Sequence, residues 1–125
     1  MGGGTIKVIT VVLTTVGSAG SATDSEVTDP IFGWFLDAYL DYHASAPNTT
    51  DVTITQTGHA DTILTVANNA TDGRYAPRQA LCTRAGAAIT DSHDLIPVNG
   101  TLTVAAAQSD ALTAAVTVTI RVLTF

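Results

Sequence analysis

Three groups of acidic and histidine side chains have types and spacings that could serve chemistry. They are Asp37 with Asp41 and His43, His59 with Asp61, and Asp91 with His93 and Asp94. Carboxylates beside a histidine can bind a divalent cation or transfer protons. On a strand, the first group extends over roughly 13 Å or more, too far for one metal ion without ligands from other strands. We interpret all three as ordinary strand-face and loop residues, and a cation at Asp91, His93 and Asp94 remains an open alternative.

The residues that a hydrolase or a phosphate-binding protein needs do not form a recognised motif. A nucleophilic serine usually lies in a Gly-x-Ser-x-Gly elbow, and the sequence contains none. Gly17-Ser18-Ala19-Gly20 has a different spacing, and no glycine loop that would cradle a phosphate is present. The single cysteine, Cys82, lacks the spacing of a redox or zinc site and is expected in the core. We therefore expect a protein that is not an enzyme and has no cofactor, metal or catalytic residues.

The charge of the chain is acidic and unevenly distributed. A net charge of −6 results from 11 acidic and five basic residues. Nucleic acids and anionic lipids bind basic surfaces, so we expect neither a nucleic acid nor a membrane as a partner. Arg74, Arg78 and Arg84 lie in a stretch without an acid, whereas Asp24 to Asp61 holds seven acids and no base. This separation could steer docking to a protein partner.

The composition favours strands over helices. The 125 residues include 22 Thr, 19 Ala and 12 Val, but one Glu, one Lys and three Gln. Branched side chains fit a pleated strand, and the residues that usually coat helix surfaces are nearly missing. On alternating strands, Thr fills outward positions where other proteins place Lys and Glu. The expected surface is polar but weakly charged, which suits a domain that packs against copies and neighbours.

The apolar spacing predicts one all-β domain over residues 1–125 with about seven strands, an antiparallel β-sandwich or barrel of jelly-roll-like type. An N-terminal strand or arm covers 1–16 and is expected to be buried on both faces. Residues 17–30 lack periodicity and are expected to form a long loop. Residues 74–96 are expected to be irregular, with short strands around Leu81 and Ile89. Residues 105–115, rich in alanine, are the only helix candidate.

Residues 31–43 predict a half-buried strand. Strict alternation places Phe35, Asp37 and Tyr39 on one face, and Trp34, Leu40 and Tyr42 on the other. Phe32, Trp34 and Phe35 form an aromatic cluster that is more typical of a core than of an interface. Arg74 and Tyr75 follow the tight turn of residues 68–73 and are better interface candidates, because Arg and Tyr often anchor interfaces.

Five segments, in order along most of the chain, resemble a known family. They are Tyr39–His43, Thr50–Ile54, Thr62–Val66, Asn69–Arg78 and Leu102–Asp110. Together they are similar to capsid decoration, or cement, proteins, which are encoded among the head genes of tailed bacteriophages. The resemblance implies an all-β structural protein of the virion that binds the outer capsid surface and stabilises it against internal DNA pressure.

The resemblance also implies partners. These are the major capsid protein and other copies of the chain, as a homotrimer in preference to a dimer. The glycine-rich N-terminus and residues 17–30 would be arms that reach neighbouring subunits. The candidate interface residues are Gly3, Thr5, Arg74, Tyr75, Arg78 and Arg84.

Two other functions fit the same β-rich sequence. One is a tail or head-to-tail component of a phage. The other is a carbohydrate-binding or adhesin-like module, in which Trp34, Tyr39 and Tyr42 would form a sugar platform. A sugar site needs flat aromatic rings that face solvent, whereas a decoration protein needs these rings in its core or at subunit seams.

Overall fold

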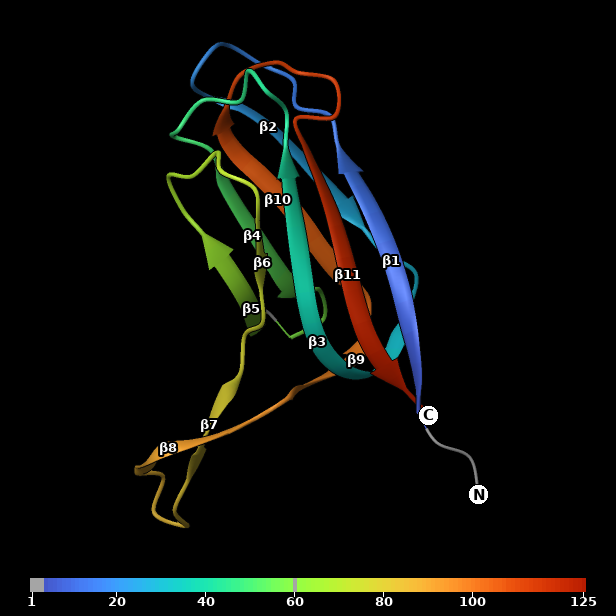
Figure 1. Ribbon diagram of the computed structural model, residues 1–125, viewed down its shortest axis with the longest axis vertical. Coiled ribbons are helices and arrows are strands. Elements are labelled where there is room, and N and C mark those ends of the chain that lie inside the picture. The colour runs from blue at the N-terminus through green and yellow to red at the C-terminus, as the bar shows by residue number, and fades with distance from the viewer. Residues whose placement is uncertain (1–3, 60) are drawn as a thin grey trace.

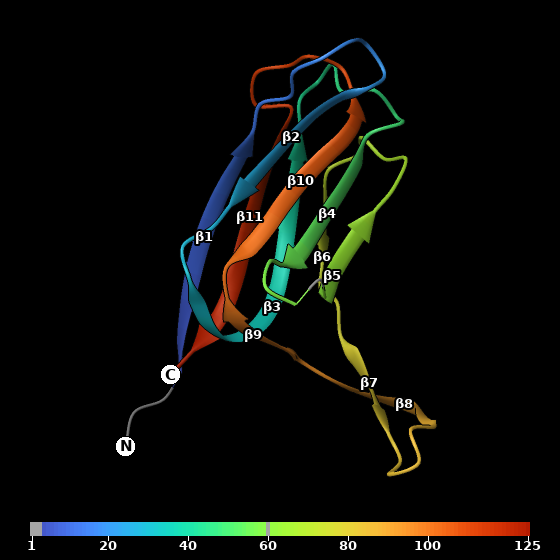
Figure 2. The same ribbon diagram turned by 180° about the vertical axis from the view of Figure 1, so that it is seen from behind.

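The computed structural model describes residues 4–59 and 61–125, and over these residues the chain is all-β with antiparallel pairing throughout. The expected fold class is confirmed, with eleven strands among the described residues rather than about seven. Eight of them form a sandwich of two facing sheets (Figures 1 and 2). These eight are β1 (Thr5–Leu13), β2 (Ala22–Val27), β3 (Ile31–Tyr42), β4 (Asp51–Gln56), β5 (Asp61–Val66), β6 (Gly73–Tyr75), β10 (Leu102–Ser109) and β11 (Val116–Thr124).

The order of the eight strands is that of a jelly roll. One sheet has the order β1-β11-β3-β6 and the other has the order β2-β10-β4-β5. The chain changes sheet after nearly every strand, and among successive strands of the sandwich only β4 and β5 form a hairpin in one sheet. Two four-stranded sheets connected in this way are the two Greek keys of a jelly roll. The short strand β9 (Ile96–Gly100) extends the first sheet by pairing with the start of β3.

The hydrophobic core lies between the two sheets. Along β4 and β11, apolar residues such as Ile54 and Ile120 are fully buried, while the Thr residues between them face outward and are partly exposed. Each fully buried aliphatic or aromatic side chain contributes about 1.5–3 kcal/mol through the hydrophobic effect. The period of two therefore decides which face of each strand is buried, as the sequence predicts.

The first strand departs from the prediction of burial on both faces. Ile6, Val8 and Val12 point outward and are 55%, 58% and 49% exposed. Only the inward side of β1 is covered, and there Leu13 is fully buried. The reason is the place of β1 at the edge of a two-layer sandwich, where no third layer covers the outer face.

Two other sequence predictions are also wrong. Residues 17–30, expected as a loop, contain strand β2, which pairs with β10 and gains its backbone hydrogen bonds there despite its lack of apolar periodicity. The helix candidate at 105–115 is instead the second half of β10 followed by a turn. β10 lies between β2 and β4, and pairing on both sides outweighs the helix preference of alanine.

A two-stranded hairpin projects from the sandwich, and we call residues 76–95 the arm. Its strands, β7 (Gln79–Cys82) and β8 (Ala88–Asp94), confirm the short strands expected around Leu81 and Ile89, and they pair only with each other. Both views show the arm extending away from the two sheets (Figures 1 and 2). Every residue from 79 to 91 is exposed. Cys82, expected in the core, is therefore an exposed free thiol.

Candidate interaction surface

A β-bulge in β3 decides which side chains reach the outer face of the first sheet. Arg121 of β11 pairs with Asp37, but the next residue, Val122, pairs with Phe35, so Leu36 is an extra residue in β3. The extra residue reverses the alternation. Phe35 is fully buried between the sheets, and Trp34 lies on the outer face together with Asp37. The strict alternation expected for residues 31–43 is therefore wrong across this position.

Apolar side chains form a band on this outer face, at the end where β1 and β3 begin and β11 ends. The cross-strand register joins Ile6 to Leu123 and Leu123 to Trp34. Val8 lies one step further along β1, and Phe32 lies one step before Trp34 on β3. We call these five residues the apolar band. Ile6, Val8 and Phe32 are more than half exposed, so the band is a surface that water contacts and that a protein partner could cover.

An ion-pair network borders the apolar band. Nε of Arg121 donates a hydrogen bond to Oδ1 of Asp37 at 2.8 Å, and a terminal nitrogen of the same guanidinium donates to Oδ2. Arg74 donates to Oδ1 from the other side at 3.2 Å, and its guanidinium lies 5.4 Å from the centre of the Tyr39 ring. These contacts gather the two arginines around Asp37, in the row of side chains next to Trp34, and Tyr39 lies one row further along β3.

The network also determines the state of the Asp37 carboxyl, which is only 7% exposed. The hydrogen bond from Arg121 lowers the pKa of Asp37 below its usual value, and this effect exceeds the opposing effect of burial. Asp37 is thus held as a carboxylate that two guanidinium groups already occupy. A carboxylate in this state is not free to bind a cation or to act as a general acid.

The other residues that could bind a metal are not brought together. Among the residues that the structure describes, no three of the His, Cys, Asp and Glu side chains lie close enough to hold an ion. Asp61 accepts a hydrogen bond from Gln56 at 3.1 Å, and Asp94 accepts one from the backbone of Leu95 at 2.7 Å. The open alternative of a cation at Asp91, His93 and Asp94 gains no support from this geometry.

The candidate interface residues have different surroundings. Thr5 begins β1 next to the apolar band, and Arg74 belongs to the ion-pair network. Tyr75 is partly buried and packs against the core. Arg78 donates to the carbonyl of Leu36 at 2.9 Å, so it satisfies the backbone of the bulge at the base of the arm.

The last two candidates are Arg84 and Gly3. Arg84 is at the exposed tip of the arm, in the turn between β7 and β8. Gly3 lies outside the described residues. The interface roles of all six candidates stay predictions.

The proposed sugar platform is not assembled. Tyr42 points into the core and is 6% exposed, whereas Trp34 and Tyr39 lie on the outer face. Asp37 and Arg121 lie between the rows that contain these two rings. Of the aromatic cluster expected in the core, only Phe35 is fully buried, and Phe32 is 63% exposed.

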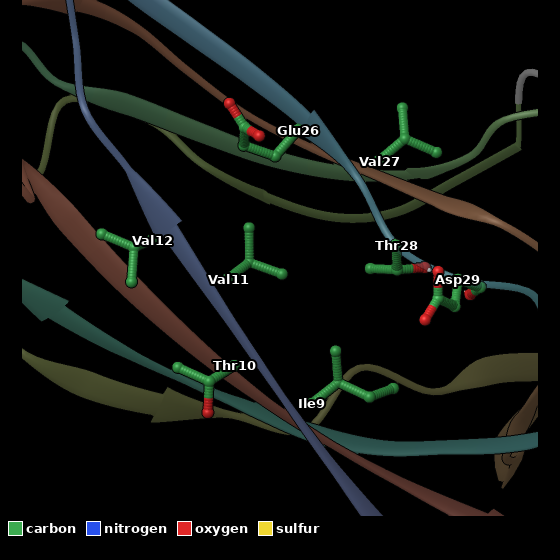
Figure 3. Close-up of a pocket in the computed structure, with 8 residues that line it drawn as sticks. All are labelled: Ile9, Thr10, Val11, Val12, Glu26, Val27, Thr28 and Asp29. Atoms are coloured by element: carbon green, nitrogen blue, oxygen red, sulfur yellow. Dashed lines mark hydrogen bonds between the residues drawn. The ribbon is translucent and has the colours of Figure 1, made fainter.

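A groove of about 330 Å³ lies between the edge strands β1 and β2. Figure 3 shows Ile9 and Val11 on the side of β1 that faces β2, and Thr10 and Val12 on its other side. We call this the acidic groove. Its lining residues are Ile9, Thr10, Val11, Val12, Glu26, Val27, Thr28 and Asp29.

The groove carries negative charge that no base compensates. Neither Glu26 nor Asp29 takes part in an ion pair among the described residues. A hydrogen bond and charge repulsion from the neighbouring Asp24 raise the pKa of Glu26. Lys7 lies two residues before Ile9, on the same face of β1, but it does not line the groove.

Sequence reasoning missed Arg121, Ile6 and Val8 as surface residues. Arg121 is the only basic residue in the last strand, opposite a strand with two acids, and this charge pattern could have suggested the pairing. The exposure of Ile6 and Val8 has no such signal, because an outward apolar residue on an edge strand resembles a core residue in sequence.

Comparison with known proteins adds no relative, because the sequence matches neither a protein-family model nor a curated protein. In the two described ranges, no helix has the length and apolar character needed to span a bilayer.

Proposed function

We propose that this protein is a structural component of a bacteriophage virion, which decorates the outer surface of the capsid and stabilises it by binding the major capsid protein. The observation that carries the proposal is the jelly-roll order of the eight sandwich strands. The jelly roll is a recurrent architecture of viral capsid proteins. The five segments that resemble decoration proteins supply the specific role.

The outer face of the first sheet supports this function physically. The apolar band contains Trp34, the two arginines surround Asp37 in the next row, and Tyr39 lies one row further along β3. Trp, Tyr and Arg are the residue types that most often dominate binding energy at interfaces. We propose that this face contacts the coat subunits. Because a capsid presents many equivalent sites, contacts that are individually weak can hold an oligomer firmly.

The proposed role needs stiffness and contact area rather than a reaction. The core between the sheets gives stiffness, and the Thr-rich outer positions keep the protein polar with little charge. The resemblance to decoration proteins favours a homotrimer over a dimer for this role. No cofactor, nucleic acid or membrane enters the proposal.

The direct test is binding to expanded, DNA-free shells assembled from the major capsid protein of the same phage. Purified protein is titrated against shells, and bound protein is measured after sedimentation. We expect saturation at a fixed ratio to coat subunits and a higher temperature of shell disruption. Absence of saturable binding, or binding without any stabilisation of the shell, contradicts the proposal.

The alternatives give different results in matched experiments. A tail or head-to-tail component would bind purified tails or portal complexes and not shells. A carbohydrate-binding module has one specific observation in its favour, the outward position of Trp34 and Tyr39. It would show quenching of Trp34 fluorescence on addition of host-cell polysaccharide, and Trp34→Phe would weaken this binding.

A further inference from the structure

The arm has a surface that its own sandwich leaves uncovered. Its two strands pair only with each other, and Leu81 and Ile89 are 42% and 41% exposed. An isolated two-stranded hairpin is marginally stable in water, because one pair of strands buries little apolar surface. Contact with another surface would therefore stabilise the arm by burying its apolar side chains.

The tip of the arm and the acidic groove have complementary charge. At the tip of the arm, residues 79–90 contain one charged side chain, Arg84, whereas the two acids of the arm, Asp91 and Asp94, lie toward the end of β8 at its base. The groove contains Glu26 and Asp29 and no base. Both surfaces also offer apolar groups, Leu81 and Ile89 on the arm and Ile9 and Val11 in the groove. Opposite charges of this kind guide docking and fix its register.

The groove offers the arm free backbone groups as well. β1 and β2 are the terminal strands of their sheets, on the same side of the sandwich. The outer edge of a terminal strand presents unpaired N–H and C=O groups, which readily pair with a strand from another chain. An extended hairpin is a suitable partner for such an edge.

The arm cannot dock into its own groove. It leaves the sandwich from the side of β6 and β9, whereas β1 and β2 lie at the opposite edges of the two sheets. Both views show this separation (Figures 1 and 2). An arm that fills the groove must therefore belong to a second molecule.

We propose that the arm of one copy of this chain docks into the acidic groove of a second copy. Arg84 pairs with Glu26 and Asp29 there, while Leu81 and Ile89 cover the apolar walls. The contact joins two different surfaces, so it is head-to-tail and generates a closed ring when the rotation between copies closes. This inference concerns contacts between copies and does not depend on binding to a capsid.

Sedimentation equilibrium under reducing conditions tests the proposal with a charge swap. Arg84→Glu and Glu26→Arg each place like charges at the contact, and each is expected to weaken self-association about tenfold or more. The double variant restores opposite charges and is expected to recover most of the loss. Both positions are exposed, and far-UV circular dichroism checks that each variant keeps its fold.

A disulfide trap tests the contact independently. Val27→Cys places a thiol on β2 at the rim of the groove, and the proposed contact brings Cys82 of a second copy near it. Mild oxidation is expected to give covalent oligomers that disappear when Cys82→Ser is added. The matched control is Thr65→Cys, an exposed position on β5 at the opposite edge of the second sheet, which is expected not to crosslink.

Three results overturn the proposal. They are a wild-type protein that stays monomeric at all concentrations, a double charge variant no better than the single variants, and equal crosslinking at Val27→Cys and Thr65→Cys. A monomer that still saturates shells contradicts only the arm-to-groove contact. An oligomer that binds no shells contradicts only the decoration function.

Discussion

Arg121 on β11 holds Asp37 on β3 through both carboxylate oxygens, with Nε donating to Oδ1 at 2.8 Å. The two residues are 84 positions apart in the sequence, and they meet because β3 and β11 are neighbours in the first sheet. The pair forms the cross-strand row next to that of Trp34 and Leu123 in the apolar band. The same ion pair therefore joins two strands of the sheet and borders the proposed contact surface.

Removal of the Asp37 charge is expected to destabilise the fold. Asp37→Asn keeps the side-chain size but weakens hydrogen bonds from two guanidinium groups. Because both arginines are partly exposed, we expect a loss of about 1–2 kcal/mol in the free energy of unfolding, measured by urea denaturation. Asp41→Asn, an exposed position on the same strand, is the control and should change stability little. Equal effects of the two substitutions would contradict a stabilising role of the network.

The same carboxylate predicts a pH dependence. Arg121 lowers the pKa of Asp37 in the folded protein below its ordinary value of 3.8. The ion pair therefore stabilises the fold above that value, and this stabilisation is lost as the pH falls through the lowered pKa. We expect the stability difference between wild type and Asp37→Asn to be constant above about pH 5 and to shrink below about pH 4. A stability difference that stays unchanged down to pH 2 would show that the Asp37 carboxylate does not stabilise the fold through its charge.

Gly33 is expected to tolerate no side chain. A Cβ atom at this position would lie 2.1 Å from the carbonyl oxygen of Leu123, which belongs to the backbone of the neighbouring strand. Gly33→Ala must displace β11 from β3, and we expect a loss of about 2–4 kcal/mol in thermal or urea unfolding. Gly58→Ala, where a Cβ would meet no atom within 4 Å, is the control. A Gly33→Ala variant as stable as this control would show that the close approach is absent.

Binding to shells is expected to depend on the apolar band. Ile6→Ser removes an exposed aliphatic side chain without disturbing the core. Loss of one such contact should weaken binding to shells about tenfold. Val16→Ser, which alters another exposed β-branched aliphatic residue, 68% exposed and outside the band, is the control. If both variants bind shells like wild type, the outer face of the first sheet is not the contact surface.

Leu36 is expected to be dispensable for the fold, because it is the extra residue of the bulge. Its deletion makes Phe35 and Asp37 consecutive, so Phe35 stays inward and Trp34 and Asp37 stay outward in the register against β11. The variant loses the hydrogen bond from Arg78 to the Leu36 carbonyl, and we expect cooperative urea unfolding with a loss of about 0.5–1.5 kcal/mol. Deletion of Ala38, which lies in the regular part of β3, turns the side chains on one side of it to the opposite faces and should abolish cooperative unfolding. Equal damage by the two deletions would contradict the bulge at Leu36.

The local sequence was sufficient to determine the class of structure. Alternation of Val, Ile and Thr predicts strands, and it identifies the buried side of β4 and β11, because the side chains of a strand point alternately to opposite faces. Turn residues at 68–73 predict the break before β6. The sequence also indicated Arg74 as a surface residue, since it follows a tight turn and has a polar, charged side chain.

The tertiary structure alone decided which strands are edges and which side chains share a face. Strand β2 has no apolar periodicity and exists because β10 pairs with it. The bulge at Leu36 is set by the register against β11, and it moves Trp34 from the expected core to the outer face. Ile6 and Val8 are exposed because they point to the outer face of a two-layer sandwich from an edge strand, a place that depends on the order of all the strands. Pairing and layering are properties of residues far apart in the chain, so the periodicity of one segment cannot determine them.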